Sequence, residues 1–267
     1  MPKYNAGFIG SGNMGSALAK AAKKSNLNSI ILADADLEKA KIVANNLSCQ
    51  FGNNEETVKN SKFIFLGVKP QVLPKVLEEI SPYLKERNDK YILVTMAAGV
   101  TIKSITDILG NAPIIRIMPN TPCAIGEGMI LYCHNAMVEK EDEQEFLALL
   151  ENAGAMDKID ESLIDAGSVV SGCGPAFVYM FIDALAEAGK ECGLDKEKAI
   201  FYASKTLIGA ANMVLQSDET PDKLRDNVCS PGGSTIEGVK SLQNDNLDEL
   251  VKKALSASFK RTKELNI

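Results

Sequence analysis

The stretch Tyr4-Asn5-Ala6-Gly7-Phe8-Ile9-Gly10-Ser11-Gly12-Asn13-Met14-Gly15 decides the fold. Its first half is a mostly apolar run typical of a buried strand, and its second half matches G-x-G-x-x-G at the start of a helical pattern, Asn13–Lys24. In such a loop the glycines provide a tight turn, close approach of backbone to a pyrophosphate, and close helix–strand packing. A glycine loop can be a plain turn, but its place between strand and helix favours a dinucleotide site at the helix N-terminus.

Short apolar runs alternate with helical patterns up to about residue 160. The predicted strands are Tyr4–Ile9, Ile30–Ala33, Phe63–Val68, Tyr91–Met96 and Ile114–Ile117. The helical patterns are Asn13–Lys24, Asp36–Leu47, Gln71–Leu84 and Ile102–Leu109, and the run Gly128–Cys133 is followed by a helical Lys140–Ala153 and a short Ala155–Lys158. This alternation predicts an α/β fold, a Rossmann-type doubly wound parallel sheet, over residues 1–161.

The pattern becomes wholly helical after about Glu161. The helical stretches are Leu163–Gly189, Lys196–Gln216, Pro221–Val228, Thr235–Leu242 and Leu247–Leu265. Small and apolar residues recur at helical spacing in the second of them, which allows close helix packing; they are Ala199, Ala203, Thr206, Leu207, Ala210 and Val214. Several of these helices are apolar on more than one face, so we expect residues 162–267 to form a helical domain that completes its core with a second chain.

Composition and charge exclude several classes of function. The 267 residues are 45% hydrophobic and 24% charged with a net charge of −6, which argues against nucleic-acid binding. The six cysteines form no Cys-x-x-Cys pair and the one histidine, His134, lies outside every motif, so no metal site is expected. There is no signal-peptide pattern and no run of about 20 apolar residues, so we expect a soluble, cytoplasmic protein with no membrane partner.

Asp34 is the candidate for recognising the cofactor's adenosine ribose. It ends the second predicted strand, where an acidic side chain can accept hydrogen bonds from the ribose hydroxyls and so favour NAD over the phosphorylated cofactor. Alternatively, Asp34 only caps the next helix or faces solvent, and Asp36 competes for both roles.

Three further loops follow strands at the same edge of the sheet. Val68-Lys69-Pro70-Gln71 could face the cofactor, although an isolated lysine is usually solvated. Ala97-Ala98-Gly99-Val100 contains only small residues, as a flat nicotinamide ring against backbone requires, but plain tight packing explains it equally well. Met118-Pro119-Asn120-Thr121-Pro122 offers two polar side chains to the cleft, or is a structural turn.

The most informative segment runs from Asp226 to Glu237 and contains Ser230-Pro231-Gly232-Gly233-Ser234-Thr235. Ser234 and Glu237 have the spacing of a capping box, which predicts a helix beginning at Ser234. The two adjacent glycines leave backbone N–H groups uncovered, so this helix start can hold a carboxylate without an arginine. An ordinary helix start does not need two adjacent glycines, which favours a ligand site.

In these motifs the chain resembles pyrroline-5-carboxylate reductase, and the resemblance extends along essentially its whole length. The match covers the glycine loop, the V-K-P-Q, A-A-G-V-T and M-P-N-T-P segments, Ser171–Ala176 with the helix after it, and Leu224–Thr235. The last segment is highly specific to that family, whereas the glycine loop is not. The resemblance implies hydride transfer from NADPH or NADH to the ring C=N of 1-pyrroline-5-carboxylate, which gives L-proline in the last step of its biosynthesis.

The resemblance also implies roles for individual residues. Thr235 would hydrogen-bond the substrate's ring nitrogen, with Gly232, Gly233 and Ser234 holding the substrate and Glu161 near its ring. The cofactor would contact Gly10, Ser11, Gly12, Asn13, Met14, Gly15, Asp34, Asn54, Val68, Lys69, Pro70, Ala97, Ala98 and Asn227. It further implies an interlocked homodimer and assembly of dimers beyond it. Family members preferring NADPH often have a polar or basic pair where this chain has Asp34-Ala35, so the sequence leans to NADH.

Two other functions compete with this interpretation. A hydroxyacid dehydrogenase with the same plan commonly uses a lysine on the first helix of its second domain, but Leu163–Ala186 contains none. A nucleotide-sensing protein could keep the fold without turnover, but the intact Ser230–Thr235 loop argues against it.

Overall fold

The structure, a computed structural model, describes residues 2–264. The chain divides into two compact units: residues up to Cys173 together with those from Ser258 onward, and Gly174–Ala257. This division lies beyond the boundary that the sequence suggests, after residue 161. The helix α7 (Glu161–Ser171) belongs to the first unit because its Ile164 is fully buried in the core beneath the sheet.

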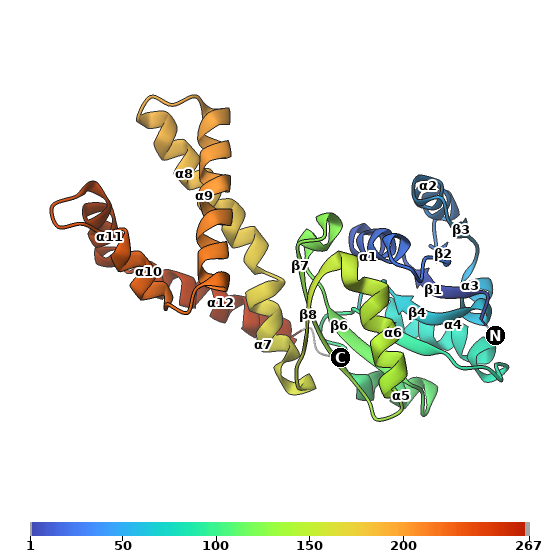
Figure 1. The fold of residues 1–267 in the computed structure, drawn as a ribbon. Helices are drawn as coiled ribbons and strands as arrows, with labels where there is room; N and C mark the ends of the chain where they lie inside the picture. The colour runs from blue at the N-terminus through green and yellow to red at the C-terminus, as the bar shows by residue number, and fades with distance from the viewer. Residues whose placement is uncertain (1, 265–267) are drawn as a thin grey trace. The chain divides into compact units, whose positions relative to one another are not determined.

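The first unit contains an eight-stranded sheet with the order β3-β2-β1-β4-β5-β6-β7-β8 (Figure 1). The strands are β1 (Tyr4–Ile9), β2 (Ile30–Ala33), β3 (Gln50–Phe51), β4 (Ser61–Leu66), β5 (Ile92–Thr95), β6 (Ile114–Met118), β7 (Gly128–His134) and β8 (Gly154–Lys158). The strands β1 to β6 are parallel, and the direction of winding reverses between β1 and β4. A doubly wound sheet opens its ligand site at such a reversal, outside the carboxyl ends of the strands.

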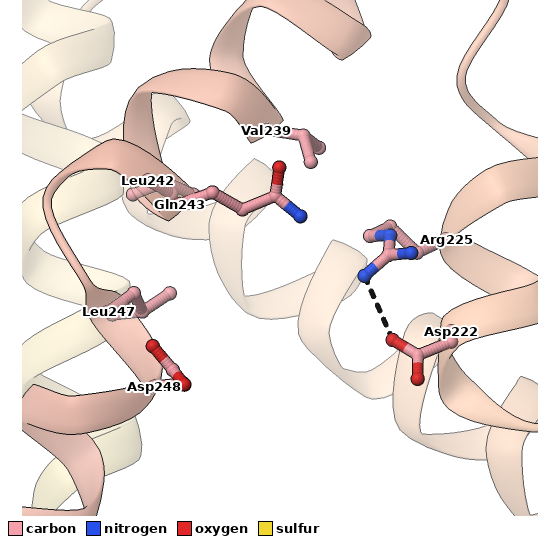
Figure 2. A pocket seen from close by; sticks show the side chains of 7 residues that line it. All are labelled: Asp222, Arg225, Val239, Leu242, Gln243, Leu247 and Asp248. Atoms are coloured by element: carbon pink, nitrogen blue, oxygen red, sulfur yellow. Dashed lines mark hydrogen bonds and ion pairs between the residues drawn. The ribbon is translucent and has the colours of Figure 1, made fainter.

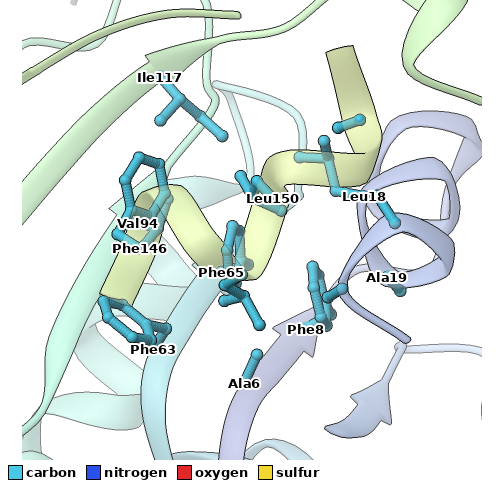
Figure 3. Packing of buried hydrophobic residues seen from close by; sticks show 14 of the residues in the cluster. Ala6, Phe8, Leu18, Ala19, Phe63, Phe65, Val94, Ile117, Phe146 and Leu150 are labelled. Carbon is cyan, nitrogen blue, oxygen red and sulfur yellow. The ribbon is translucent and has the colours of Figure 1, made fainter. Parts of the chain in front are cut away.

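Two apolar cores cover the two faces of this sheet. On one face, helices α1 (Asn13–Lys24) and α6 (Lys140–Leu150) pack over the rings of Phe8 and Phe65, which stack with centroids 4.4 Å apart (Figure 3). On the other face lie α4 (Leu73–Lys85), α5 (Ile102–Leu109) and α7. The expected α/β class and Rossmann-type sheet are confirmed.

Two parts of the sheet differ from the expected pattern. The strand β7 runs antiparallel to β6, because only a short turn with the 3₁₀ helix Thr121–Ile125 joins them and a parallel pair needs a longer crossover. Between α2 (Leu37–Leu47) and β4 lie the two-residue β3 and the helix α3 (Asn54–Asn60), which the sequence reading missed.

A buried arginine ties the last strands of the sheet to two helices. Arg116 on β6 is 2% exposed and bonds Asp165 of α7 through Nη2 at 2.9 Å. The other oxygen of Asp165 accepts from Lys263, at the end of α12 (Leu247–Glu264), at 3.0 Å. The ion pairs therefore hold the end of the last helix on the first unit.

The second unit is helical and has almost no core of its own. It contains α8 (Gly174–Glu191), α9 (Lys196–Gln216), α10 (Pro221–Asn227), α11 (Ser234–Asn244) and the first part of α12. Helices α8 and α9 lie side by side (Figure 1), with Gly189 against Ala199. Of the small-residue face expected on α9, only Ala199 and Ala203 are buried, whereas Thr206, Ala210 and Val214 are exposed.

Large apolar side chains of this unit are exposed in the single chain. Met180 of α8 is 72% exposed, and Phe201 of α9 is 58% exposed. Contrary to the sequence expectation, Glu161–Glu191 is long and apolar enough to cross a membrane, by length and composition only. A helix that packs its apolar side chains on a second copy of the chain can pass the same test.

We expect the folding of the protein to depend on its concentration, because the second unit lacks an internal core. The midpoint of thermal unfolding should rise with protein concentration, and sedimentation velocity should show a dimer at micromolar concentration. A monomer that stays folded at micromolar concentration, with a midpoint independent of dilution, would contradict this expectation.

Candidate functional site

The loop after β1 needs each of its three glycines for a different reason. Gly10 has φ +103°, and a Cβ there would lie 2.6 Å from the carbonyl oxygen of Gly67 on the neighbouring strand's loop. A Cβ on Gly15 would lie 2.1 Å from the carbonyl oxygen of Gly10. A Cβ on Gly12 would meet no atom within 4 Å. Gly10 and Gly15 are thus required by packing, and Gly12 faces open space where a ligand can approach the backbone.

The start of α1 carries uncovered backbone N–H groups. Gly12 is the N-cap residue and supplies no side chain to cap the helix. Asn13 is exposed, and Met14 is half-buried and packs against the core beneath. The free N–H groups and the positive end of the helix dipole make this helix start suitable for a pyrophosphate.

Asp36 takes the capping role that the sequence left open, and Asp34 contacts the glycine loop. Asp36 is the N-cap residue of α2, and its Oδ1 accepts from the backbone N–H of Lys39 at 3.2 Å. Asp34 holds the glycine loop, because its Oδ2 accepts from the N–H of Ser11 at 2.6 Å. The Lys39 ammonium lies 3.5 Å from the same Oδ2. Asp34 therefore stays at the carboxyl end of β2 with its charge partly offset.

These elements surround a cavity of about 400 Å³ at the β1–β4 reversal. Of the predicted cofactor residues, the structure brings together Gly10, Gly12, Asp34, Asn54, Val68 and Lys69 around it. The sequence reading missed the other lining residues, Ile9, Ala35, Lys39, Gly67, Val72, Lys75, Val76 and Glu79. Val72, Lys75, Val76 and Glu79 have the spacing i, i+3, i+4, i+7 of one helical face, and this signal could have identified them.

The remaining predicted cofactor residues of the first unit support the cavity and do not line it. Ser11 and Gly15 are buried beneath the glycine loop. Ala97 is buried in the core and Ala98 packs against it, which matches the tight-packing interpretation of this loop. Pro70 faces a separate apolar cavity of about 290 Å³ between α4 and α5.

Glu161 is engaged by the protein itself. Its Oε1 accepts from the backbone N–H of Ile102, the first residue of α5, at 2.7 Å, and from Nη1 of Arg116 at 3.3 Å. A carboxylate at this position stabilises the N-terminus of α5. The contacts of Glu161 thus indicate a structural role, whereas its contact with substrate rests on the family resemblance.

In the second unit, Ser230-Pro231-Gly232-Gly233 forms a tight turn before α11. The N–H of Gly233 donates to the carbonyl oxygen of Ser230 at 3.0 Å, and Gly232 has φ +71°. Proline followed by a glycine of positive φ is typical of a type II turn. Gly232 is required by its positive φ, whereas a Cβ on Gly233 would lie 2.5 Å from the Ser230 hydroxyl, which can rotate away.

The helix α11 begins at Ser234, as expected, but the predicted capping box is wrong. Gly233 is the N-cap residue, so Ser234 is already the first helical residue and its side chain is misplaced for capping. Glu237 instead bonds Lys240 at 2.8 Å. In the part of the chain that the structure describes, no group bonds the exposed hydroxyls of Ser234 and Thr235, and the first N–H groups of α11 stay uncapped by side chains.

Asn227 ends α10, and its amide donates to Glu219 at 2.8 Å. A cavity of about 660 Å³ lies between α10, α11 and the start of α12. Figure 2 shows this open space between the Arg225–Asp222 ion pair and the side chains of Leu242 and Leu247. The helices leave it open because no residue of α10 or α11 is buried in the single chain.

Two buried thiols are unreactive, and the histidine lies away from the cavity at the β1–β4 reversal. Burial raises the pKa of the Cys133 thiol to about 11 and also raises the pKa of the Cys123 thiol. Both remain protonated at neutral pH, whereas a nucleophile or metal ligand must be a thiolate. His134 donates from Nδ1 to the carbonyl of Asn135 at 2.8 Å, and it does not line the cavity at the β1–β4 reversal.

Substitutions at Gly12 and Gly15 should separate binding from folding. Gly12→Ala should fold normally, because its Cβ meets open space, but should weaken NADH binding by roughly ten-fold, about 1.4 kcal/mol. Gly15→Ala should lower stability by about 3 kcal/mol through overpacking against Gly10. Thermal unfolding and NADH titration of both variants test this, and equal loss of stability in the two would contradict it.

Two family models match the chain. Residues 161–265 match the family described as pyrroline-5-carboxylate reductase dimerisation. Residues 5–99 match the family described as NADP oxidoreductase coenzyme F420-dependent. The two matches cover the helical half and the glycine-loop half of the chain, respectively.

Relatives and solved structures agree with these matches. Pyrroline-5-carboxylate reductase 2 of Homo sapiens is 39% identical over 97% of this chain and 83% of its own length. Pyrroline-5-carboxylate reductase of Glycine max is 34% identical over 98% of this chain and 96% of its own length. The Plasmodium falciparum pyrroline carboxylate reductase crystallised with NADP superposes with a TM-score of 0.89 at 32% identity, covering both chains completely. With this identity along nearly its whole length, the chain belongs to the pyrroline-5-carboxylate reductase family.

Proposed function

We propose that this enzyme reduces 1-pyrroline-5-carboxylate to L-proline, with the dinucleotide held at the β1–β4 reversal and the substrate at the start of α11. The observation that carries the proposal is that two helices begin without a side-chain cap. These helices are α1, whose N-cap residue is Gly12, and α11, whose N-cap residue is Gly233. One suits a pyrophosphate and the other a carboxylate. The bound nicotinamide supplies the hydride, and the protein residues bind and orient.

The substrate end requires little acid–base chemistry from the protein. A cyclic imine protonated on nitrogen already accepts a hydride well, so alignment with the cofactor is the main task. The backbone N–H groups after Gly232 and Gly233 would hold the substrate carboxylate together with the Ser234 hydroxyl. The Thr235 hydroxyl, which is exposed, would hydrogen-bond the ring nitrogen.

For the cofactor we propose a preference for NADH over NADPH. Asp34 lies at the carboxyl end of β2, where the adenosine ribose of a dinucleotide binds. A carboxylate can accept from the 2′-hydroxyl of NADH, but it repels the 2′-phosphate of NADPH. Lys39 offsets part of this repulsion, so the preference should be moderate.

The active enzyme would be a homodimer, and dimers would assemble further. A cytoplasmic location agrees with the six cysteines, which are all free thiols. Following oxidation of NADH and NADPH with pyrroline-5-carboxylate as acceptor tests the whole proposal. The absence of oxidation with either cofactor would remove it and would favour a nucleotide-sensing protein.

We predict that NADH gives the higher kcat/KM and that Asp34→Asn narrows the gap between the cofactors by roughly five-fold, since a charge beside the 2′-position is removed. The asparagine keeps an acceptor for the N–H of Ser11, so the glycine loop should stay in place. Asp34→Ser should narrow the gap too, but should also lower the melting temperature because that acceptor moves away. A clear preference of the unchanged enzyme for NADPH would show that Asp34 does not hydrogen-bond the adenosine ribose.

We predict that Thr235→Val lowers kcat/KM by roughly ten- to a hundred-fold, about 1.5–3 kcal/mol, because one hydrogen bond to a charged group is lost. Valine keeps the shape and the backbone N–H groups of α11. Affinity for NADH should hardly change, since the glycine loop that holds the phosphates belongs to the first unit. Normal kinetics with a lowered melting temperature would instead make Thr235 a structural residue of the helix start.

A further inference from the structure

A hydrogen bond between two helices forms part of the wall of the cavity that Asp34 lines. Asn54, the first residue of α3, donates from Nδ2 to Oε1 of Glu79 on α4 at 3.0 Å. Both residues line the same cavity as Asp34 and the glycine loop. Asn54 precedes β4 in the chain and Glu79 follows it, and the helices α3 and α4 that carry them are in direct contact.

The carboxylate of Glu79 fixes which way the Asn54 amide faces. An ionised carboxylate can only accept hydrogen bonds, so the NH₂ group of the amide must turn to Glu79 and its oxygen must turn away. In the described part of the chain no group donates to Asn54 Oδ1. The amide therefore offers an acceptor, rather than a donor, to a ligand in the cavity.

The charges around this cavity sort into two sets. Asp34 and Glu79 are negative, and Lys39, Lys69 and Lys75 are positive. Lys39 is engaged by Asp34 at 3.5 Å. Lys75 lies one helical turn before Glu79 on the same face of α4. Glu79 thus places a negative charge on the same wall of the cavity as Lys75.

We propose that Glu79 is a specificity-determining residue that selects NADH against NADPH. It acts by turning the Asn54 amide oxygen toward the ribose and by opposing the positive charge of Lys75. Hydroxyl groups of a ribose can donate to Asp34 and to the Asn54 oxygen, whereas a 2′-phosphate can donate to neither. This inference rests on the proposed binding of the dinucleotide along the β1–β4 reversal.

The test is cofactor affinity rather than turnover alone. The reduced nicotinamide absorbs light at wavelengths where protein side chains do not, so the emission of bound NADH or NADPH can be titrated directly. In Glu79→Gln the charge is lost and Asn54 becomes free to turn its NH₂ group to a phosphate. The Kd for NADPH should fall by roughly three-fold or more relative to the Kd for NADH, and the change should shrink at high salt.

Glu78→Gln is the matched control, because it removes the same charge one residue earlier on α4 from a side chain that does not line the cavity. It should leave the ratio of the two Kd values unchanged. The double variant Glu79→Gln, Asn54→Ala should lose most of the gain in NADPH affinity, because the amide is needed for it.

The outcomes distinguish this inference from the function on which it rests. If Glu78→Gln and Glu79→Gln shift the ratio equally, or if neither shifts it, Glu79 has no specific role although the enzyme binds its cofactor as proposed. If the unchanged enzyme binds neither NADH nor NADPH, the dinucleotide site itself is overturned. A selective shift with Glu79→Gln that depends on Asn54 supports the inference.

Discussion

The close approach of three glycine backbones where the sheet reverses is the constraint on which the first unit depends. Because Gly15 has no side chain, the start of α1 can pack directly on the carbonyl group of Gly10. Gly10 in turn packs on Gly67, in the loop after the adjacent strand. No side chain fits between these backbones. With α1 held so close to β1, its alanines can pack directly on Phe8 and its neighbours, and the uncapped helix start opens into the cavity above the strand ends.

The two units solve the problem of burying apolar surface in opposite ways. The first buries two cores on the two faces of one sheet. The second, from Gly174 to Ala257, buries only Ala186, Ala199 and Ala203 among its apolar residues, so its helices need a second chain as their core. The turn at Ser230–Gly233, where we propose that the substrate binds, belongs to this unit, and its geometry comes from local backbone contacts that do not require that core.

Local sequence patterns predicted most of the helices and strands and about half of the residues that line the cavity at the β1–β4 reversal. The bounds of β1, α1, β2, α5 and α9 agree with the sequence reading, because each has a clear period and clear ends. The sequence did not predict the helix α3, because its seven mostly polar residues show no hydrophobic periodicity. The predicted capping box at Ser234 is wrong because Gly233, one residue earlier, has the extended conformation of an N-cap residue. The Asn54–Glu79 contact joins distant segments, and such a contact leaves no signal in a single sequence.

The return of the last helix to the first unit has a consequence for how the protein is made. The residues from Ser258 onward belong with the sheet, and Lys263 supplies an ion pair to Asp165 beside the buried Arg116. During synthesis on the ribosome, the sheet emerges well before these residues do. The first unit is therefore finished only after Lys263 has left the exit tunnel, and the helical unit is an insertion within the first unit.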